Sequence, residues 1–260
     1  MELSVQSFQL VEHVLTLGYA AMAASLFYFI LTIRTTAPKY RPSSVLSVVV
    51  MVSALLLLME QQDSWVAAFT ASETEGMMTL TGNFSNGFRY LNWLIDVPML
   101  LIQILFIVGV TGAAFKKYVA QFAGAGMLMV LTGYIGQFSE PVEYSGQGGN
   151  VAMWLLWGVV STVFYAFVLI LITRVIKEGK KNLAKSKALP LFSVLLPLFY
   201  VSWTLYPLAY IMPVLPFEFG IVAQQVIYTI ADVASKVIYG VILTLVGTMM
   251  SAEAGFEEAA

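Results

Sequence analysis

Four charged residues lie well inside stretches that are otherwise apolar enough to cross a membrane: Arg89, Asp96, Asp232 and Lys236. A charge inside a bilayer is costly, and by default it marks a functional site. Asp232 and Lys236 are four residues apart, so on a helix they share a face. Burial disfavours a charged lysine, a nearby carboxylate favours it, and such an amine can form a Schiff base with an aldehyde. An Asp–Lys pair that only joins two helices explains these residues about equally well.

A polar stripe around Asp96 favours the functional interpretation. At about 100° per residue, Arg89, Asn92, Asp96 and Gln103 fall within an arc of about 60°. They span roughly 21 Å along a helix axis. The other residues of this segment are mostly Leu, Ile, Val, Met and Trp. Polar side chains at stepped depths are what an ion or proton path through a membrane requires.

Aromatic residues are the third feature of these segments. Flat rings around a buried lysine could hold a long conjugated ligand, although packing or membrane-interface contact is the commoner role of any single ring. Pro207 is expected to kink its helix and free a backbone carbonyl. The candidate ligand-contacting residues are Trp93, Trp203, Tyr206 and Pro207.

Composition indicates what must position these side chains. The chain has 260 residues, of which 59% are hydrophobic and 11% charged, against about 45–50% apolar and about 25% charged in soluble domains. The excess apolar surface predicts contact with lipid. A net charge of −2 argues against a nucleic-acid partner. Cysteine is absent and His13 is the only histidine, which excludes disulfides and thiol catalysis and leaves little for histidine chemistry.

Hydropathy predicts an all-α membrane protein with seven transmembrane helices in one domain over residues 1–260. A span needs roughly 20 apolar residues. A short hairpin is expected between the second and third spans, around 69–82. The predicted spans are 9–33, 43–62, 87–113, 119–138, 150–176, 189–213 and 220–249.

The loop charges predict the orientation of the bundle. Apart from Arg89 and Lys236, every Lys and Arg lies in or beside the first, third and fifth loops. The alternate loops carry acidic residues such as Asp63, Glu73 and Glu218. The positive-inside rule therefore places the N-terminus outside the cell and the C-terminus in the cytoplasm. Only an odd number of spans gives that result, which independently supports seven.

Three segments resemble the microbial rhodopsins. Residues 89–98 are similar to their helix C, residues 202–207 to helix F, and residues 232–236 to the part of helix G that holds retinal. The resemblance covers essentially the whole chain. It implies a light-driven transporter rather than an enzyme, with all-trans retinal joined to Lys236 as a Schiff base. The residues that it places around retinal are Trp93, Trp203, Tyr206, Pro207 and Ser235.

Three helix C positions resemble a subgroup, the light-driven sodium pumps. Outward proton pumps usually carry Asp, Thr and then Asp or Glu, whereas this chain has Asn92, Asp96 and Gln103. The resemblance implies outward sodium transport, with the Schiff base proton moving transiently to Asp96 and sodium passing transiently between Asn92 and Asp232. Arg89 would stand on the outward side. It also implies a pentamer embedded in the lipid of a bacterial plasma membrane.

The same resemblance predicts an ion path on both sides of retinal. Ser44 and Thr244 stand where those pumps have Asn and Gly, which bears on selectivity among cations. Gln224 replaces an Arg near the exit, and Gly82 replaces an Asp linked to an interfacial sodium site. The predicted path residues are Ser44, Ser47, Ser53 and Thr244 on the inner side, and Gln137 and Glu140 on the outer side. Glu60 is a further candidate from its position alone, because it lies at the outer end of the second span on roughly the face of Ser53; a solvated charge at a helix end explains it at least as well.

Other functions fit parts of this pattern. A light-driven proton pump, or proton transport when sodium is absent, is the main alternative, although Asn92 and Gln103 argue against a dedicated one. A sensory seven-helix photoreceptor is a second alternative, which the continuous polar stripe disfavours. A transporter without retinal is a remote third, because it gives Lys236 no purpose.

Overall fold

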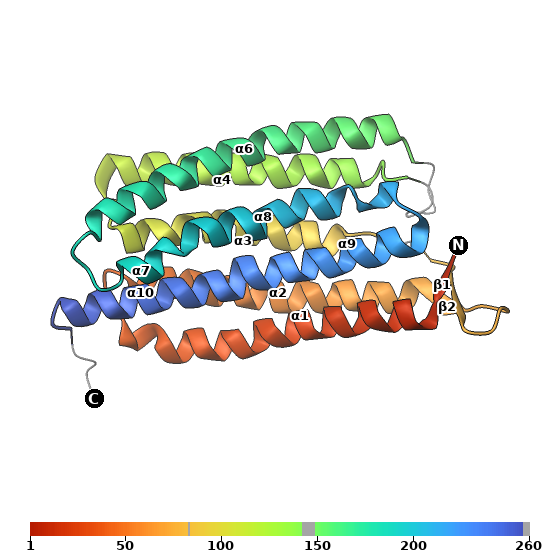
Figure 1. Ribbon diagram of the computed structural model, residues 1–260, viewed down its shortest axis with the longest axis horizontal. Coiled ribbons are helices and arrows are strands. Elements are labelled where there is room, and N and C mark those ends of the chain that lie inside the picture. The colour runs from red at the N-terminus through yellow and green to blue at the C-terminus, as the bar shows by residue number, and fades with distance from the viewer. Residues whose placement is uncertain (83, 142–148, 257–260) are drawn as a thin grey trace.

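A computed structural model describes residues 1–82, 84–141 and 149–256 of the chain. Within these residues, seven helical segments are long and apolar enough to cross a membrane, as predicted. They lie side by side as one bundle (Figure 1). The first six spans are built from α1 (Val5–Thr32), α2 (Arg41–Ala68), α3 (Gly87–Val108), α4 (Gly112–Gln137), α6 (Val151–Asn182) and α8 (Leu195–Tyr210), the last preceded by the short α7 (Leu189–Ser193).

The seventh span consists of three helical elements that follow one another without a break. They are α9 (Phe217–Asp232), a π-helical stretch η3 (Val233–Ile238) and α10 (Tyr239–Glu253). Two short 3₁₀ turns, η1 (Ile33–Thr35) and η2 (Met212–Val214), follow α1 and α8. Neighbouring spans pack in chain order, and the seventh closes the bundle against both α8 and α1.

The turn between α3 and α4 lies earlier than hydropathy predicted. Span boundaries at 113 and 119 were expected, but α3 ends at Val108 and α4 begins at Gly112. Gly109 adopts φ +77° and donates its N–H to Leu105 O, which is a left-handed helix cap that glycine adopts without strain. Residues 109–115 contain no charge, so the apolar pattern runs through a turn that backbone geometry makes.

A small sheet covers one end of the bundle. β2 (Phe69–Ala71) pairs antiparallel with β3 (Met77–Leu80), which confirms the predicted hairpin. A third strand, β1 (Glu2–Ser4), pairs with the other edge of β3 and was not predicted. The Glu2 carboxylate accepts hydrogen bonds from Ser72 and Thr79, which lowers its pKa.

The two ends of the bundle differ in charge. The N-terminus and the sheet lie at one end, here called the sheet end, and α10 ends at the other (Figure 1). The opposite end carries the loops rich in Lys and Arg and is called the basic end. The assignment of the basic end to the cytoplasm stays a prediction from the charge pattern.

Candidate functional site

Lys236 lies at the centre of the candidate site, in the π-helical stretch η3. Its side chain is buried, and its Nζ contacts Asp232 Oδ1. The Nζ atom also lies 3.9 Å from Asp96 Oδ2 on α3. Single turns of π-helix inside an α-helix are often found at functional sites. The structure thus brings the predicted lysine and both predicted carboxylates together.

Asp232 is held by donors from four directions. Arg89 Nη1 donates to Asp232 Oδ2 at 2.9 Å. Trp93 Nε1 and Tyr206 Oη each donate to Oδ1 at 2.9 Å, the oxygen that also contacts Lys236. A carboxylate with two cations and two neutral donors is strongly stabilised in its charged form.

Asp96 has fewer partners. Asn92 Nδ2 donates to Asp96 Oδ2 at 2.6 Å and to Ser53 Oγ at 3.0 Å. Among the described residues, Asp96 Oδ1 and Asn92 Oδ1 are buried without a hydrogen-bond partner. These two oxygens can therefore accept a proton or a small cation. Asn92 lies with Asp96 and Ser53, and the structure shows no hydrogen bond between Asn92 and Asp232 within its described parts.

On the basic-end side of Lys236, the polar residues form a pair that is not hydrogen-bonded to the charged centre in the part of the chain that the structure describes. Ser47 Oγ donates to Gln103 Oε1 at 2.8 Å, and Gln103 Nε2 is buried without a partner in the part of the chain that the structure describes. Ser44 and Thr244, predicted to line the inner entrance, are both buried. This half of the bundle is filled mostly by aliphatic and aromatic side chains.

On the sheet-end side, hydrogen bonds continue outward from Arg89. Its Nε and Nη2 approach Gln225 Oε1 at 3.4 Å, and Gln225 Nε2 donates to Asn86 Oδ1 at 2.9 Å. Asn86 Nδ2 then donates to Gln224 Oε1 at 3.0 Å, and Gln224 Nε2 to Glu140 Oε1 at 3.3 Å. We call this chain of contacts the amide relay. Its members Asn86 and Gln225, and Thr229 beside Arg89, were missing from the predicted site, because uncharged residues near span ends give no distinct signal.

The predicted outer path residues divide into two groups. Glu140 lies just beyond α4, is buried at the end of the amide relay, and has its pKa raised to about 7 by that burial. Gln137 is buried nearby, and its carbonyl accepts the Glu140 N–H. Glu60 is exposed on α2 and takes no part in the relay as the described residues show it.

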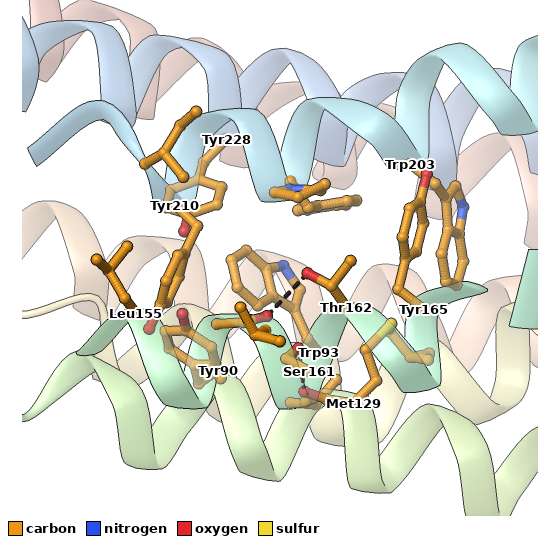
Figure 2. A pocket seen from close by; sticks show the side chains of 18 residues that line it. Tyr90, Trp93, Met129, Leu155, Ser161, Thr162, Tyr165, Trp203, Tyr210 and Tyr228 are labelled. Atoms are coloured by element: carbon orange, nitrogen blue, oxygen red, sulfur yellow. Dashed lines mark hydrogen bonds between the residues drawn. The ribbon is translucent and has the colours of Figure 1, made fainter. Parts of the chain in front are cut away.

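An aromatic cavity of about 220 Å³ lies beside the Asp232 carboxylate. Trp93 and Tyr206, which both donate to Asp232, are part of its wall. Figure 2 shows Trp203 and Tyr165 at one end of the cavity, Tyr210 and Leu155 at the other, and Trp93 between them. The cavity wall also includes Pro207, and Ser235 lies within 2.8 Å of Tyr206 Oη.

The cavity is lined mostly by apolar and aromatic side chains, and Lys236 is not among its lining residues. Three of its lining residues contact the charged site: Trp93 and Tyr206 donate to Asp232, and the Tyr228 ring lies 5.6 Å from the Arg89 guanidinium. Within the described residues, no group of three or more His, Cys, Asp or Glu side chains could hold a metal ion. The arrangement places a buried amine, Lys236, between one carboxylate with many partners, Asp232, and one with few, Asp96.

Comparison with known proteins places the chain in a family. The model of the bacteriorhodopsin-like proteins matches residues 9–250, so the chain belongs to that family. Green-light absorbing proteorhodopsin of Gamma-proteobacterium EBAC31A08 is 25% identical over 90% of this chain and 85% of its own length. Bacteriorhodopsin-I of Haloquadratum walsbyi is 25% identical over 60% of this chain and 56% of its own.

Solved structures agree with this assignment. Xanthorhodopsin, described as a light-driven ion pump with dual chromophore, matches with a TM-score of 0.86 and 30% identity over 99% of both chains. A thermophilic rhodopsin matches with a TM-score of 0.84 and 28% identity over 98% of this chain and 99% of its own. Rhodopsins of this family bind retinal through a lysine Schiff base and act as light-driven ion transporters, not as enzymes.

Proposed function

We propose that this protein is a light-driven outward sodium pump with retinal attached to Lys236. The observation that carries the proposal is the position of the buried carboxyl groups. Among the described residues, Asp96, Asp232 and Glu140 are the buried carboxyl groups, and none of them lies on the basic-end side of Lys236. Gln103 occupies that side instead, and an amide does not exchange its proton as a carboxylic acid does.

The residues around Lys236 divide the work between them. Retinal, when bound, supplies light absorption and an isomerisation that displaces the Lys236 nitrogen. Asp232 stays ionised as a fixed counterion, because Arg89, Trp93 and Tyr206 saturate its oxygens. Asp96, with one unpartnered oxygen and 3.9 Å from Lys236 Nζ, is the acceptor for the proton on that nitrogen.

Loss of that proton opens the site to a cation. While the proton is on Asp96, the positive charge at Lys236 is gone and sodium can pass from the Ser47 and Gln103 side. Asn92 Oδ1 and Ser53 Oγ are hard oxygen ligands beside the path, the type that a small hard cation prefers. When the proton returns to Lys236, the renewed positive charge repels sodium toward Arg89 and the amide relay.

Proton pumping is the second candidate function. It is favoured by the Lys236–Asp96 geometry, which serves proton displacement equally well, and by the similarity to green-light absorbing proteorhodopsin over 85% of that protein's length. If the protein is a proton pump, the Lys236 nitrogen regains its proton from water that enters at the basic end. No buried carboxylic acid among the described residues of that side would donate it.

Ion flux in cells tests the two candidates against each other. Illuminated cells in NaCl should show a rise in external pH that a protonophore enhances, because outward sodium charge draws protons inward. In CsCl the signal should vanish or reverse, because a large cation fits poorly beside Asn92. Acidification in NaCl that is abolished by a protonophore and indifferent to sodium would establish proton pumping instead.

We further propose that the chain works as a homo-oligomer, which the family resemblance predicts to be a pentamer, in a bacterial plasma membrane.

We also propose that the basic end lies in the cytoplasm. The loop charges support this orientation. The chain has no native cysteine, so single cysteines can be introduced at Ser72 and Ser186 and labelled from outside intact cells. Labelling at Ser72→Cys alone supports the orientation, and labelling at Ser186→Cys alone reverses it.

A further inference from the structure

A groove lies on the outside of the bundle at the basic end, between α2 and α3. Its volume is about 440 Å³. Apolar side chains from both helices form its floor, namely Val45, Leu46, Ile102 and Phe106. Arg41, the first residue of α2, is the charged residue of its wall in the described part of the chain. The groove therefore combines an apolar floor with a cationic rim.

The side chain of Arg41 is held in place at this rim. Its Nε donates to Thr36 O at 2.9 Å, and its guanidinium carbon lies 5.8 Å from the centre of the Phe256 ring. A guanidinium has five N–H donors, so its Nη edge remains for an anion, and that planar fork matches the geometry of a phosphate. Lys39 is exposed two residues earlier and adds a second cation, with its Nζ 4.7 Å from the centre of the Tyr40 ring.

The rim and the floor stand at different depths in the bundle. Val45 follows Arg41 by four residues, or about 6 Å along the helix axis. Phe106 lies two residues before α3 ends at Val108. The cations are therefore at the level where lipid head groups meet the basic end, and the apolar floor is at the level of the acyl chains.

We propose that this groove binds an anionic phospholipid, whose phosphate pairs with Arg41 and Lys39 and whose acyl chain lies along Val45 and Phe106. A lipid chain fills any groove on such a surface, and it is as apolar as the side chains there, so the floor alone gives little preference. The rim supplies the preference, because cations near a membrane surface attract anionic head groups.

The lipid site and the inner polar pair are two faces of one contact between α2 and α3. Leu46 and Ile102 line the groove, whereas the next residue on each helix, Ser47 and Gln103, hydrogen-bonds inside the bundle at 2.8 Å. The bound chain thus covers the outer side of the Ser47–Gln103 pair.

Native mass spectrometry of the full-length protein tests the site. The protein in detergent is mixed with equal amounts of phosphatidylglycerol and phosphatidylcholine that carry the same acyl chains, and the lipid retained per polypeptide chain is measured. Phosphatidylglycerol should be retained in preference. Arg41→Gln and Lys39→Gln should each weaken this preference about fivefold, which is the effect of one cation near an anionic lipid. Lys181→Gln, at an exposed lysine of the same end, should leave it unchanged.

A second pair of variants tests the floor of the groove. Val45 and Val194 are 45% and 46% exposed at the basic end, and of the two Val45 lines the groove. Val45→Trp fills the groove and should lose most of the retained phosphatidylglycerol, whereas Val194→Trp should keep it. If Val45→Trp does not accumulate, Arg41→Gln and Lys39→Gln decide the matter, and an unchanged preference in both overturns the site.

Three further results would overturn the lipid site. The first is equal retention of the two lipids by the unaltered protein. The second is displacement of the lipid by inorganic phosphate beyond the effect of chloride at equal ionic strength, which would indicate a site for free anions. The third is a change in the number of copies per assembly in Val45→Trp with the lipid per chain unchanged, which would show that a second copy occupies the groove.

Discussion

The polar residues on the two sides of Lys236 are organised differently. Toward the sheet end, hydrogen bonds run from Asp232 through Arg89 and the amide relay to Glu140. Toward the basic end, the Ser47–Gln103 pair stands among apolar side chains. In the proposed pump, a transported ion would thus meet a connected polar path on one side and a mostly apolar barrier on the other.

In the proposed pump, this difference would set the direction of transport. A connected set of amides and charges offers polar ligands to a passing ion, whereas an apolar segment offers none and has to be opened. The side that must be opened is the side that the photochemical change has to control. In the proposed pump, the Arg89–Asp232 pair is the contact that an outward-moving cation would have to pass on its way to the amide relay.

The largest effect is expected at the junction of the two sides. Lys236→Ala should give a protein without a visible absorption band when retinal is supplied, because the attachment amine is gone. Lys181→Ala, at an exposed lysine of α6, is the control and should be coloured. A band that survives in Lys236→Ala would show that retinal is held elsewhere.

Asp96→Asn should abolish light-driven transport while leaving the protein coloured. The substitution removes the proton acceptor 3.9 Å from Lys236 Nζ but keeps the side-chain shape. Removing a negative charge beside the chromophore should also shift the band to longer wavelength. Flash spectroscopy should show that proton loss from the Lys236 nitrogen is blocked, whereas Asp63→Asn at an exposed site should behave as the unaltered protein. Unchanged proton loss in Asp96→Asn would mean that the acceptor lies elsewhere.

Gln103→Glu should weaken the difference between the two sides. It places a carboxylic acid on the basic-end side, within reach of Ser47. Proton return to Lys236 in sodium-free medium should then accelerate, on the order of 100-fold for a well-placed general acid, and lose its dependence on sodium concentration. Ser47→Ala, which removes the hydrogen bond without adding an acid, should not have this effect. Sodium-dependent return that persists in Gln103→Glu would contradict the role given to Gln103.

The sequence predicted the charged centre of the site better than its surroundings. Arg89, Asp96, Asp232 and Lys236 stand out because a charge in an apolar span is rare, and all four meet in the structure. Gln225 and other relay amides do not stand out, because Asn and Gln near span ends are equally compatible with a simple interface. Their roles depend on which helices face each other, and hydropathy does not specify that.

The fold shows the same division. Span number follows from hydropathy and loop charge, whereas span ends follow from local backbone geometry, such as the left-handed cap at Gly109. The second span was predicted to end at 62, but α2 continues past the polar residues 60–63 to Ala68. Gln61 there is buried and donates to Ser85 O. Strand β1 was missed because its three residues gain their pairing from β3, far along the chain.

The smallest effect is expected where the amide relay ends, at Glu140. Burial raises the pKa of this carboxyl from 4.5 to about 7. Above about pH 4.5, the unfolded chain has therefore lost a proton that the folded protein keeps. The free energy of unfolding consequently falls as pH rises toward about 7, and it levels off at higher pH.

The substitution Glu140→Gln keeps the shape of the side chain and removes its titration. Its thermal midpoint in detergent should exceed that of the unaltered protein by an amount that grows over this range, at roughly 2–4 °C for each kcal/mol. Glu60→Gln, at an exposed carboxylate, should show no such growth. If the thermal midpoints of Glu140→Gln and the unaltered protein change with pH in parallel, Glu140 is already ionised in the folded protein over this range. The amide relay would then end in a fixed negative charge and not in a group that titrates near neutral pH.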